Sequence, residues 1–178
     1  RLLGSNEVLL AREGQKILGM IHLNPYHIRT GEKTYTLNYI VAVAVWKEYR
    51  RQGIMAAMLT KCLNDMHQKR QPFTYLMPAN KAYYEPFQFT FVMDWEETMI
   101  HSMNDSDKII PAIQQDARIV TAPEEEYDRI TIFLEQFMQP YQIYTIPDKQ
   151  YLRRLSKESQ SGEGNLMAVS YTHLRAHE

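Results

Sequence analysis

The chain has 178 residues, of which 44% are hydrophobic and 23% are charged. This composition is that of an ordinary globular protein, and it excludes a wholly disordered chain and a collagen-like repeat. Lys and Arg total 20 against 21 Asp and Glu, which gives a net charge of -1. Non-specific binding of nucleic acid requires a strong cationic field, so we expect no nucleic-acid partner. Any anionic ligand must be met by a local cluster of cations.

The single cysteine, Cys62, permits no internal disulfide, so the fold does not depend on an oxidising compartment. No apolar run approaches the roughly 20 residues that a membrane helix needs, and the start at Arg1 shows no signal-peptide layout. We therefore expect a cytoplasmic protein with no membrane partner. Because the start also lacks a methionine, we interpret the chain as a fragment or a processed product.

The first half of the chain predicts three strands. Residues 7–12 and 16–23 have strand-like composition and are separated by a turn signal at 13–14. Pro25 is expected to end the second strand. Residues 35–45 are the most strand-like segment, rich in valine and continuously apolar at the end. Continuous apolarity, rather than alternation, predicts a strand that is covered on both faces.

From residue 53 onward, the spacing of the apolar residues is that of a helix. In 53–69 they recur every three or four positions on one face, which predicts an amphipathic helix. A short strand at 72–77, a short helix at 80–84 that Asn80 can cap, and a strand at 87–93 follow. The expected order is therefore three antiparallel strands, a helix, a strand, a short helix and a strand.

The expected domain organisation has four segments. A first domain covers 1–98, and the polar, poorly patterned stretch 99–118 serves as a linker. The start of a second domain covers 119–170 and is too short to be complete. Residues 171–178 resemble a non-native extension, and we leave them out of the fold.

Two helices and a strand are expected in the second segment. The acidic residues 124–126 suit the dipole at the start of the first helix. The apolar face of that helix consists of Tyr127, Ile130, Phe133, Leu134 and Phe137. The second helix is expected at 148–159, and a strand is expected at 165–170.

The segment most relevant to chemistry is 49–56, between the valine-rich strand and the amphipathic helix. A strand-to-helix turn leaves backbone N–H groups without helical partners, and the helix dipole adds positive potential there. Gly53 lets a ligand approach the backbone, and Arg50 and Arg51 add charge, so the segment suits a phosphate or pyrophosphate. Taken alone, R-x-x-G is a weak pattern that favours a solvated loop. The glycine spacings of a P-loop and of a dinucleotide site are missing.

Several motifs together resemble the GNAT acetyltransferase superfamily. They are the strand, the turn RRQGIMA, the following helix and YYEPFQF at 83–89. More narrowly, GIM at 53–55 and LMPA at 76–79, followed by YEPF, resemble the Eis-like branch (enhanced intracellular survival protein). The resemblance covers about 5–98, and 141–151 resembles the start of the second GNAT-like domain of that branch.

This resemblance implies an α/β (α+β) GNAT fold, in which helices flank a mixed, mostly antiparallel central sheet. The truncated start of a second GNAT-like domain follows. It also implies an N-acetyltransferase that moves an acetyl group from acetyl-CoA to a primary amine, aminoglycoside-like or another cationic amine. A homo-oligomer is implied for the full-length protein. The alternative is a non-catalytic acyl-CoA-binding or assembly module, and a fragment can bind acetyl-CoA and still be nearly inactive.

The resemblance further implies where acetyl-CoA binds. The pyrophosphate would lie on the backbone amides of Arg51, Gln52, Gly53, Met55 and Ala56. The pantetheine arm would pair with the strand end at Val43 and Val45. An N–H near Val45 would face the thioester oxygen, where negative charge grows as an amine attacks.

Tyr84 matches the family tyrosine near the sulfur of CoA, a general acid for the departing thiolate. A free tyrosine has a pKa near 10 and a thiol near 8.5, so complete proton transfer is uphill by about 2 kcal/mol. Tyr84 is therefore expected to act mainly as a hydrogen-bond donor. Two alternatives stay open: a purely structural core aromatic, and the neighbouring Tyr83 in the same role. Gln88 replaces the glycine of the family pattern Y-x-x-x-G-F, which puts the local bend in doubt.

The acceptor amine must also lose a proton, because a lysine-like amine has a pKa near 10.4. In the Eis-like branch this role belongs to the C-terminal carboxylate, delivered by a sterol-carrier-like domain that we expect to be absent here. His22, His27 and Glu85 are the local candidates, although a strand histidine is more often structural. His173 and His177 are four apart, but not in a convincing helix, so we expect no metal site.

Overall fold

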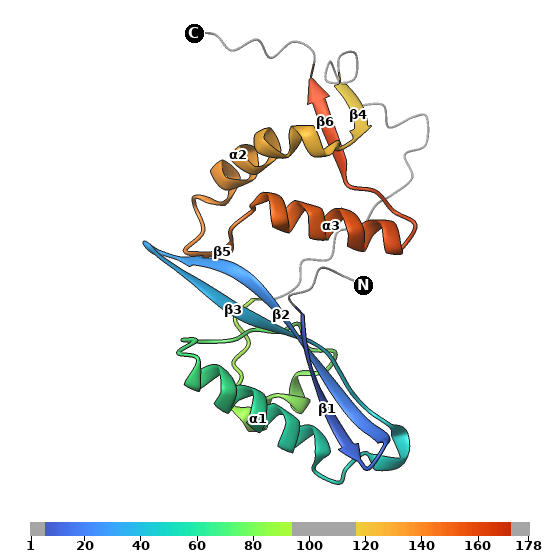
Figure 1. Cartoon of the computed structure of the whole chain (residues 1–178). Coiled ribbons are helices and arrows are strands. Elements are labelled where there is room, and N and C mark those ends of the chain that lie inside the picture. The colour runs from blue at the N-terminus through green and yellow to red at the C-terminus, as the bar shows by residue number, and fades with distance from the viewer. Residues whose placement is uncertain (1–5, 94–116, 172–178) are drawn as a thin grey trace, which may run out of the picture.

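A four-stranded sheet organises the first half of the chain (Figure 1). Strand β1 (Glu7–Glu13) pairs with β2 (Lys16–Thr30), and β2 pairs with β3 (Lys33–Val45), in both cases antiparallel. A short strand, β5 (Ile143–Thr145), joins the far end of β2. This computed structural model describes residues 6–93 and 117–171.

Strand β2 continues past Pro25, which corrects the expectation that Pro25 ends it. Pro25 lies opposite Asn38 of β3, and its carbonyl oxygen accepts a hydrogen bond from Arg154 Nη1 at 2.9 Å. In an antiparallel ladder the N–H and C=O of one residue point to the same side. Position 25 therefore faces away from β3, beyond the last β1 pair at Leu23. Proline is tolerated because no ladder bond needs its N–H.

Strand β3 is only partly covered. Leu37 and Asn38 are both buried, as expected for a strand with two covered faces. Ala42 and Ala44 near its end are exposed, so the expectation is wrong there. The apolar run at this end consists of small residues beside an open sheet edge.

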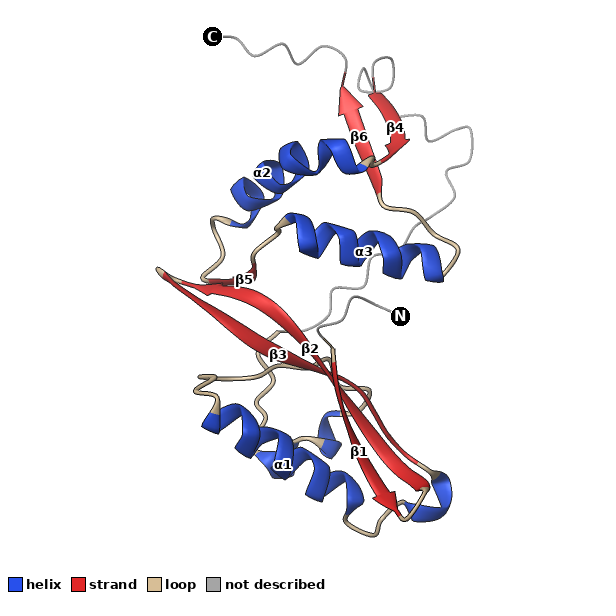
Figure 2. Ribbon diagram, in the orientation of Figure 1, coloured by secondary structure: helices blue, strands red, loops and turns tan. Residues whose placement is uncertain are grey.

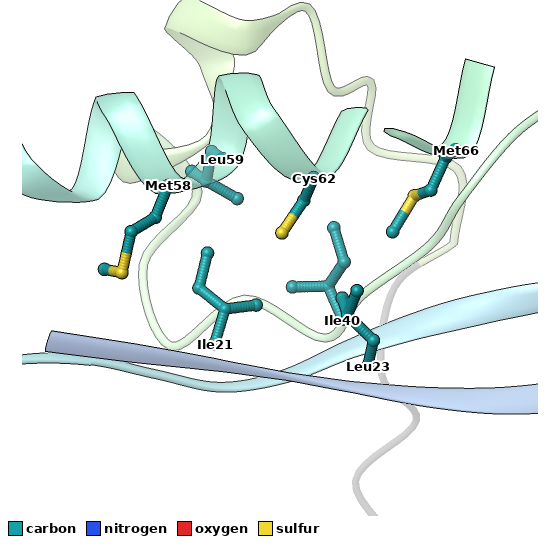
Figure 3. Close-up of a cluster of buried hydrophobic side chains, with 7 residues drawn as sticks. All are labelled: Ile21, Leu23, Ile40, Met58, Leu59, Cys62 and Met66. Carbon is teal, nitrogen blue, oxygen red and sulfur yellow. The ribbon is translucent and has the colours of Figure 1, made fainter. Parts of the chain in front are cut away.

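Helix α1 (Ile54–Gln68) packs on one face of this sheet, as its apolar period predicts. The buried cluster of Figure 3 joins the helix to β2 and β3 through Met58, Leu59, Cys62, Met66, Ile21, Leu23 and Ile40. Gly19 of β2 lies below the helix, where an added Cβ would be 2.9 Å from Ala44 O and 2.9 Å from Met58 Cε. The missing side chain of Gly19 thus lets the first turns of α1 lie close to the strand ends.

The segment after α1 has less strand than expected. The strand expected at 72–77 is reduced to one parallel bridge between Tyr39 and Tyr75, next to a 3.0 Å hydrogen bond from Ile40 N to Tyr75 O. The short helix expected at 80–84 is confirmed as the 3-10 helix η2 (Lys81–Tyr83). Its predicted cap is also present, because the side chain of Asn80 accepts from Ala82 N at 3.0 Å.

The strand expected at 87–93 is wrong. A second 3-10 helix, η3 (Glu85–Phe87), precedes Gln88, which has φ +64°. This left-handed conformation is the one that glycine adopts without strain, and it stands where the family pattern has a glycine. The backbone from Gln88 to Met93 is irregular.

A second group of elements lies across the sheet from α1 (Figure 2). It contains α2 (Tyr127–Met138), preceded by the 3-10 turn Glu124–Glu126, and α3 (Lys149–Ser161). Strands β4 (Ala117–Thr121) and β6 (Met167–Tyr171) form a separate antiparallel pair. Ala122, Tyr127 and Leu152 form the buried hydrophobic cluster of this group. Within the predicted apolar face of α2, Phe133 and Phe137 are 64% and 59% exposed, so this face is only partly covered.

The two groups of elements are in contact. Besides the pairing of β5 with β2, Ile146 N donates to His27 O at 2.8 Å and Gly31 N donates to Gln142 O at 3.0 Å. Most of the expected linker 99–118 and of the expected tail 171–178 lies outside the described residues. The division into domains therefore stays a prediction. In the part of the chain that the structure describes, no helix has the length and apolarity to cross a membrane.

Candidate functional site

The connection between β3 and α1 has an unusual backbone. It begins with the 3-10 helix η1 (Lys47–Tyr49), and two left-handed residues follow, Arg51 with φ +62° and Gly53 with φ +81°. In turns of this kind successive backbone N–H groups can converge on one side and form a concavity for an anion. Arginine in the left-handed region is strained, so the surrounding contacts must hold it there.

The start of α1 is open. The first hydrogen bond of the helix runs from Ala57 N to Gly53 O at 2.9 Å, so the amides of Ile54, Met55 and Ala56 precede it. Gly53 offers no side chain to cap these amides, and the first turn contains no acidic residue. A Cβ added at Gly53 would meet no atom within 4 Å. The helix thus presents its amides and the positive end of its dipole to open space.

The two arginines of the turn have different surroundings. Arg50 Nε donates to Val45 O at 3.1 Å, which fixes the end of β3 to the turn. Gln52 Nε2 similarly donates to Glu48 O at 3.1 Å. Arg51 is exposed at the tip of the turn. Arg50 therefore both shapes the turn and adds charge, whereas Arg51 adds charge at the surface.

A β-bulge near the end of β3 changes which side of the strand its backbone N–H and C=O groups face. Met20 pairs with Ala44 but His22 pairs with Val41, and Ala42 has φ +52°. The extra residue shifts the alternation of inward and outward groups. Residues after the bulge therefore point differently from those before it.

Val45 lies after this bulge and faces the open edge of β3. Its carbonyl accepts from Arg50, while the next N–H, that of Trp46, donates back to Leu18 O of β2 at 3.0 Å. The N–H of Val45 thus points away from β2, and alternation places Val43 on the same side. Within the described residues, the pairing on this edge is the bridge between Tyr39 and Tyr75, and no strand pairs with the stretch that contains Val43 and Val45. The geometry brings together the turn, the helix start and the two valines that the sequence analysis selected.

Tyr84 and Tyr83 differ in burial. Tyr84 is half-buried, packs against the core of Figure 3 and contacts Phe89 with ring centroids 5.8 Å apart. Burial raises the pKa of Tyr84, with a smaller contribution from Tyr39 in the same direction. Tyr83 is 59% exposed. Of the two phenols, Tyr84 is the one held in a fixed, partly desolvated environment.

The three candidate bases lie in different places. His22 is half-buried on β2, opposite Val41. His27 Nδ1 is 3.3 Å from Thr36 Oγ1, in the half of β2 that pairs with β5 rather than the half next to the turn. Glu85 is exposed at the start of η3. No side-chain group of three or more His, Cys, Asp or Glu suited to a metal occurs among the described residues, and His173 and His177 lie outside them.

The family of the chain follows from its sequence. A sequence model of the acetyltransferase (GNAT) domain matches residues 1–92, which is more than half of the 178 residues. The chain belongs to the GNAT acetyltransferase family. The expected GNAT fold, with a mixed, mostly antiparallel sheet and helices, is confirmed. No curated protein matches the chain.

Solved structures resemble this GNAT domain at low identity. A protein of Bacillus halodurans has a TM-score of 0.50 at 16% identity and covers 56% of this chain and 69% of its own, which shows the fold alone. A probable N-acyltransferase of Enterococcus faecalis has a TM-score of 0.46 at 21% identity and covers 48% of this chain. A predicted acetyltransferase of Clostridium acetobutylicum, solved with acetyl-CoA, has a TM-score of 0.47 at 18% identity and covers 53% of this chain. This chain spans 22% of the length of the Enterococcus faecalis protein and 64% of the length of the Clostridium acetobutylicum protein.

The GNAT turn has one further contact that the sequence analysis missed. Lys16 Nζ donates a hydrogen bond to Tyr49 OH, and it lies 4.7 Å from the centroid of the Tyr49 ring. The two residues are 33 positions apart. No sequence pattern could reveal this pair, because it depends on how the β1–β2 hairpin lies against the end of β3.

Proposed function

We propose that this GNAT domain transfers an acetyl group from acetyl-CoA to a primary amine, an aminoglycoside-like or other cationic amine. The observation that carries the proposal is the open start of α1, with uncapped amides, no first-turn acid and two neighbouring arginines. These are the features that favour a pyrophosphate. Its amides would be those of Arg51, Gln52, Gly53, Met55 and Ala56.

The outward edge of β3 suits the pantetheine arm. That arm contains amide groups, which pair with an unpaired strand edge as a peptide does. Val43 and Val45 would supply this pairing. The N–H of Val45 would then stabilise the negative charge that grows on the thioester oxygen. Acetyl-CoA supplies the activated acetyl group, and this chain supplies the groups that bind and orient it.

Tyr84 is proposed as the hydrogen-bond donor to the sulfur. As the amine nitrogen bonds to the acetyl carbon, the C–S bond breaks and the sulfur takes up the electron pair. The raised pKa of Tyr84 makes full proton transfer to a thiolate less favourable, so we assign it a donor role in which the phenol keeps its proton. Its burial against the core supports this role over that of the exposed Tyr83.

Several broader expectations accompany this proposal. We propose an Eis-like GNAT protein with a second GNAT-like domain from 119 onward, cytoplasmic and a homo-oligomer at full length. The motifs at 53–55, 76–79 and 83–89 support the Eis-like placement. The general base stays open among His22, His27, Glu85 and a C-terminal carboxylate.

Release of free thiol from acetyl-CoA, measured with a panel of primary amines, tests the proposed function. We expect amine-dependent release from this chain or a longer natural form of it. Tyr84→Phe should lower kcat about tenfold or more, since one stabilising donor is lost, while the matched variant Tyr83→Phe should retain the wild-type rate. A full-length form that binds acetyl-CoA but shows no amine-dependent release would identify the non-catalytic module instead.

A further inference from the structure

A contact from outside the turn joins it to the β1–β2 hairpin. Lys16 is the first residue of β2, directly after the hairpin loop at 14–15 and opposite Glu13. Its ammonium group donates to the phenol oxygen of Tyr49 and lies 4.7 Å from the centroid of the ring. The hydrogen bond to the hydroxyl is thus the contact that joins Lys16 to Tyr49.

Tyr49 is well placed to transmit this contact. It ends η1, immediately before Arg50 and Arg51, and its N–H donates to Trp46 O at 2.9 Å. The other side-chain contacts of the turn, from Arg50 and Gln52, reach only five and four residues back along the chain. Lys16 links the same turn to a separate hairpin.

Such a link matters because the turn includes a strained residue. Arg51 holds a left-handed conformation, which a non-glycine residue rarely adopts. A turn of this kind relaxes unless its ends are fixed. The β3 bulge and the Arg50 contact fix one end, and the Lys16–Tyr49 contact restrains the same turn from the hairpin side.

We propose that Lys16 and Tyr49 form a positioning pair that holds the turn 50–53 ready for the phosphate groups of acetyl-CoA. The inference rests on the proposed function and adds two residues to its binding site. Neither residue is assigned a contact with the ligand. The pair acts through the backbone of the turn, so its loss should weaken binding of acetyl-CoA without changing the chemical step.

The surroundings of Lys16 favour positioning over direct phosphate binding. The hydrogen bond and charge interaction with Tyr49 raise the pKa of Lys16, and the carboxylates of Glu13 and Glu48 raise it further. These two carboxylates offset the lysine charge and oppose an anion at that spot. The ammonium group already donates one hydrogen bond to the phenol oxygen of Tyr49.

A double-mutant cycle on the whole chain tests the pair. Calorimetric titration with acetyl-CoA should show that Lys16→Met and Tyr49→Phe each raise Kd about two- to fivefold, the range for an exposed contact. The double variant should be no weaker than either single variant, because both remove one interaction. Lys16→Arg should bind nearly as the wild type does. Lys33→Met is the matched control, since Lys33 begins β3 after the other hairpin loop.

Three results decide between the possibilities, once circular dichroism shows that each variant is folded. If Lys16→Met weakens binding but Tyr49→Phe does not, Lys16 contacts the ligand directly and the positioning role is wrong. If the wild type binds acetyl-CoA and neither variant weakens the binding, the positioning role is also wrong, but the proposed function stands. A folded wild type that binds no acetyl-CoA overturns both. Where turnover is measurable, a rise in KM for acetyl-CoA with unchanged kcat supports positioning.

Discussion

The starts of α1 and α3 are built in opposite ways. At α3, Asp148 Oδ1 accepts from Tyr151 N at 2.7 Å, so the helix caps its own amides with a carboxylate. At α1, Gly53 provides no cap, and the preceding residues 50–51 are both arginines. Both helices are of similar length, 15 and 13 residues. The two ends therefore differ in chemistry rather than in size.

This difference separates a structural helix end from a binding one. A capped end stabilises its own helix, typically by about 1 kcal/mol, and leaves little for a ligand to satisfy. An uncapped end gives up that stabilisation and keeps its amides available for an external anion. The contrast is informative because both ends occur in one chain, and each can be converted toward the other by substitution.

The largest expected effect comes from reversing the charge beside the open end. The double variant Arg50→Glu/Arg51→Glu should weaken acetyl-CoA binding about a hundredfold, because like charges then oppose the pyrophosphate. Calorimetric titration at low salt measures this. The matched control, Lys33→Glu/Lys157→Glu, makes the same change of net charge at exposed positions on β3 and α3. Equal weakening by both double variants would mean that overall charge, not this turn, governs binding.

A smaller effect, on stability, is expected at Gly19, where α1 packs closely on the sheet. Gly19→Ala should lower the free energy of unfolding by about 1–3 kcal/mol. The new Cβ would come within 2.9 Å of Ala44 O, a backbone atom that cannot move alone. Urea unfolding measures the loss, and Gly162→Ala is the control, since its nearest contact is an ordinary 3.6 Å to Ser159 O. Equal stability of the two variants would contradict the close packing at Gly19.

Removing the Asp148 cap at the start of α3 should lower stability modestly without affecting acetyl-CoA binding. Asp148→Ala should lower stability by about 1 kcal/mol and leave the Kd for acetyl-CoA unchanged. Asp148→Asn should retain most of the stability, because an amide oxygen can accept the same hydrogen bond. Thermal unfolding and titration together measure both quantities. Weaker acetyl-CoA binding by Asp148→Ala would show that the two helix ends are not independent.

The smallest expected effect concerns pH: the contribution of Tyr84 to kcat should not change near neutral pH. Because burial raises its pKa above the ordinary value near 10, the phenol proton is lost only as pH rises through that raised pKa. The ratio of the wild-type kcat to that of Tyr84→Phe should therefore stay constant from about pH 6 to pH 9. A ratio that falls within this range would show that Tyr84 ionises there and is not a constant donor.

Sequence alone predicted the parts that depend on local pattern. The apolar period of α1, the cap at Asn80, and the strands β1 and β3 are all visible as periodicity or as side-chain chemistry. The turn between β3 and α1 was found for the same reason, since its arginines and glycine are contiguous. The family resemblance then gave a weak local pattern a functional meaning.

The errors fall where distant residues decide the outcome. Whether Pro25 ends β2 depends on which strands border that position, and β1 stops before it. The expected strands at 72–77 and 87–93 have strand-like composition, but only one bridge to β3 forms and Gln88 turns left-handed. Phe133 and Phe137 follow the helical period of α2, yet burial requires a neighbour that the period cannot supply. The Lys16–Tyr49 contact likewise depends on three-dimensional packing.

The most direct test of the account is to add a capping side chain to the uncapped start of α1. Acetyl-CoA would be titrated into the wild-type chain, Gly53→Asp and Gly53→Asn, which place side chains of equal size at the same left-handed position. The account predicts that the wild type binds, that Gly53→Asn weakens binding by about tenfold or less, and that Gly53→Asp weakens it a further tenfold or more through its charge. Equal affinities for the aspartate and asparagine variants would contradict a pyrophosphate at this helix start.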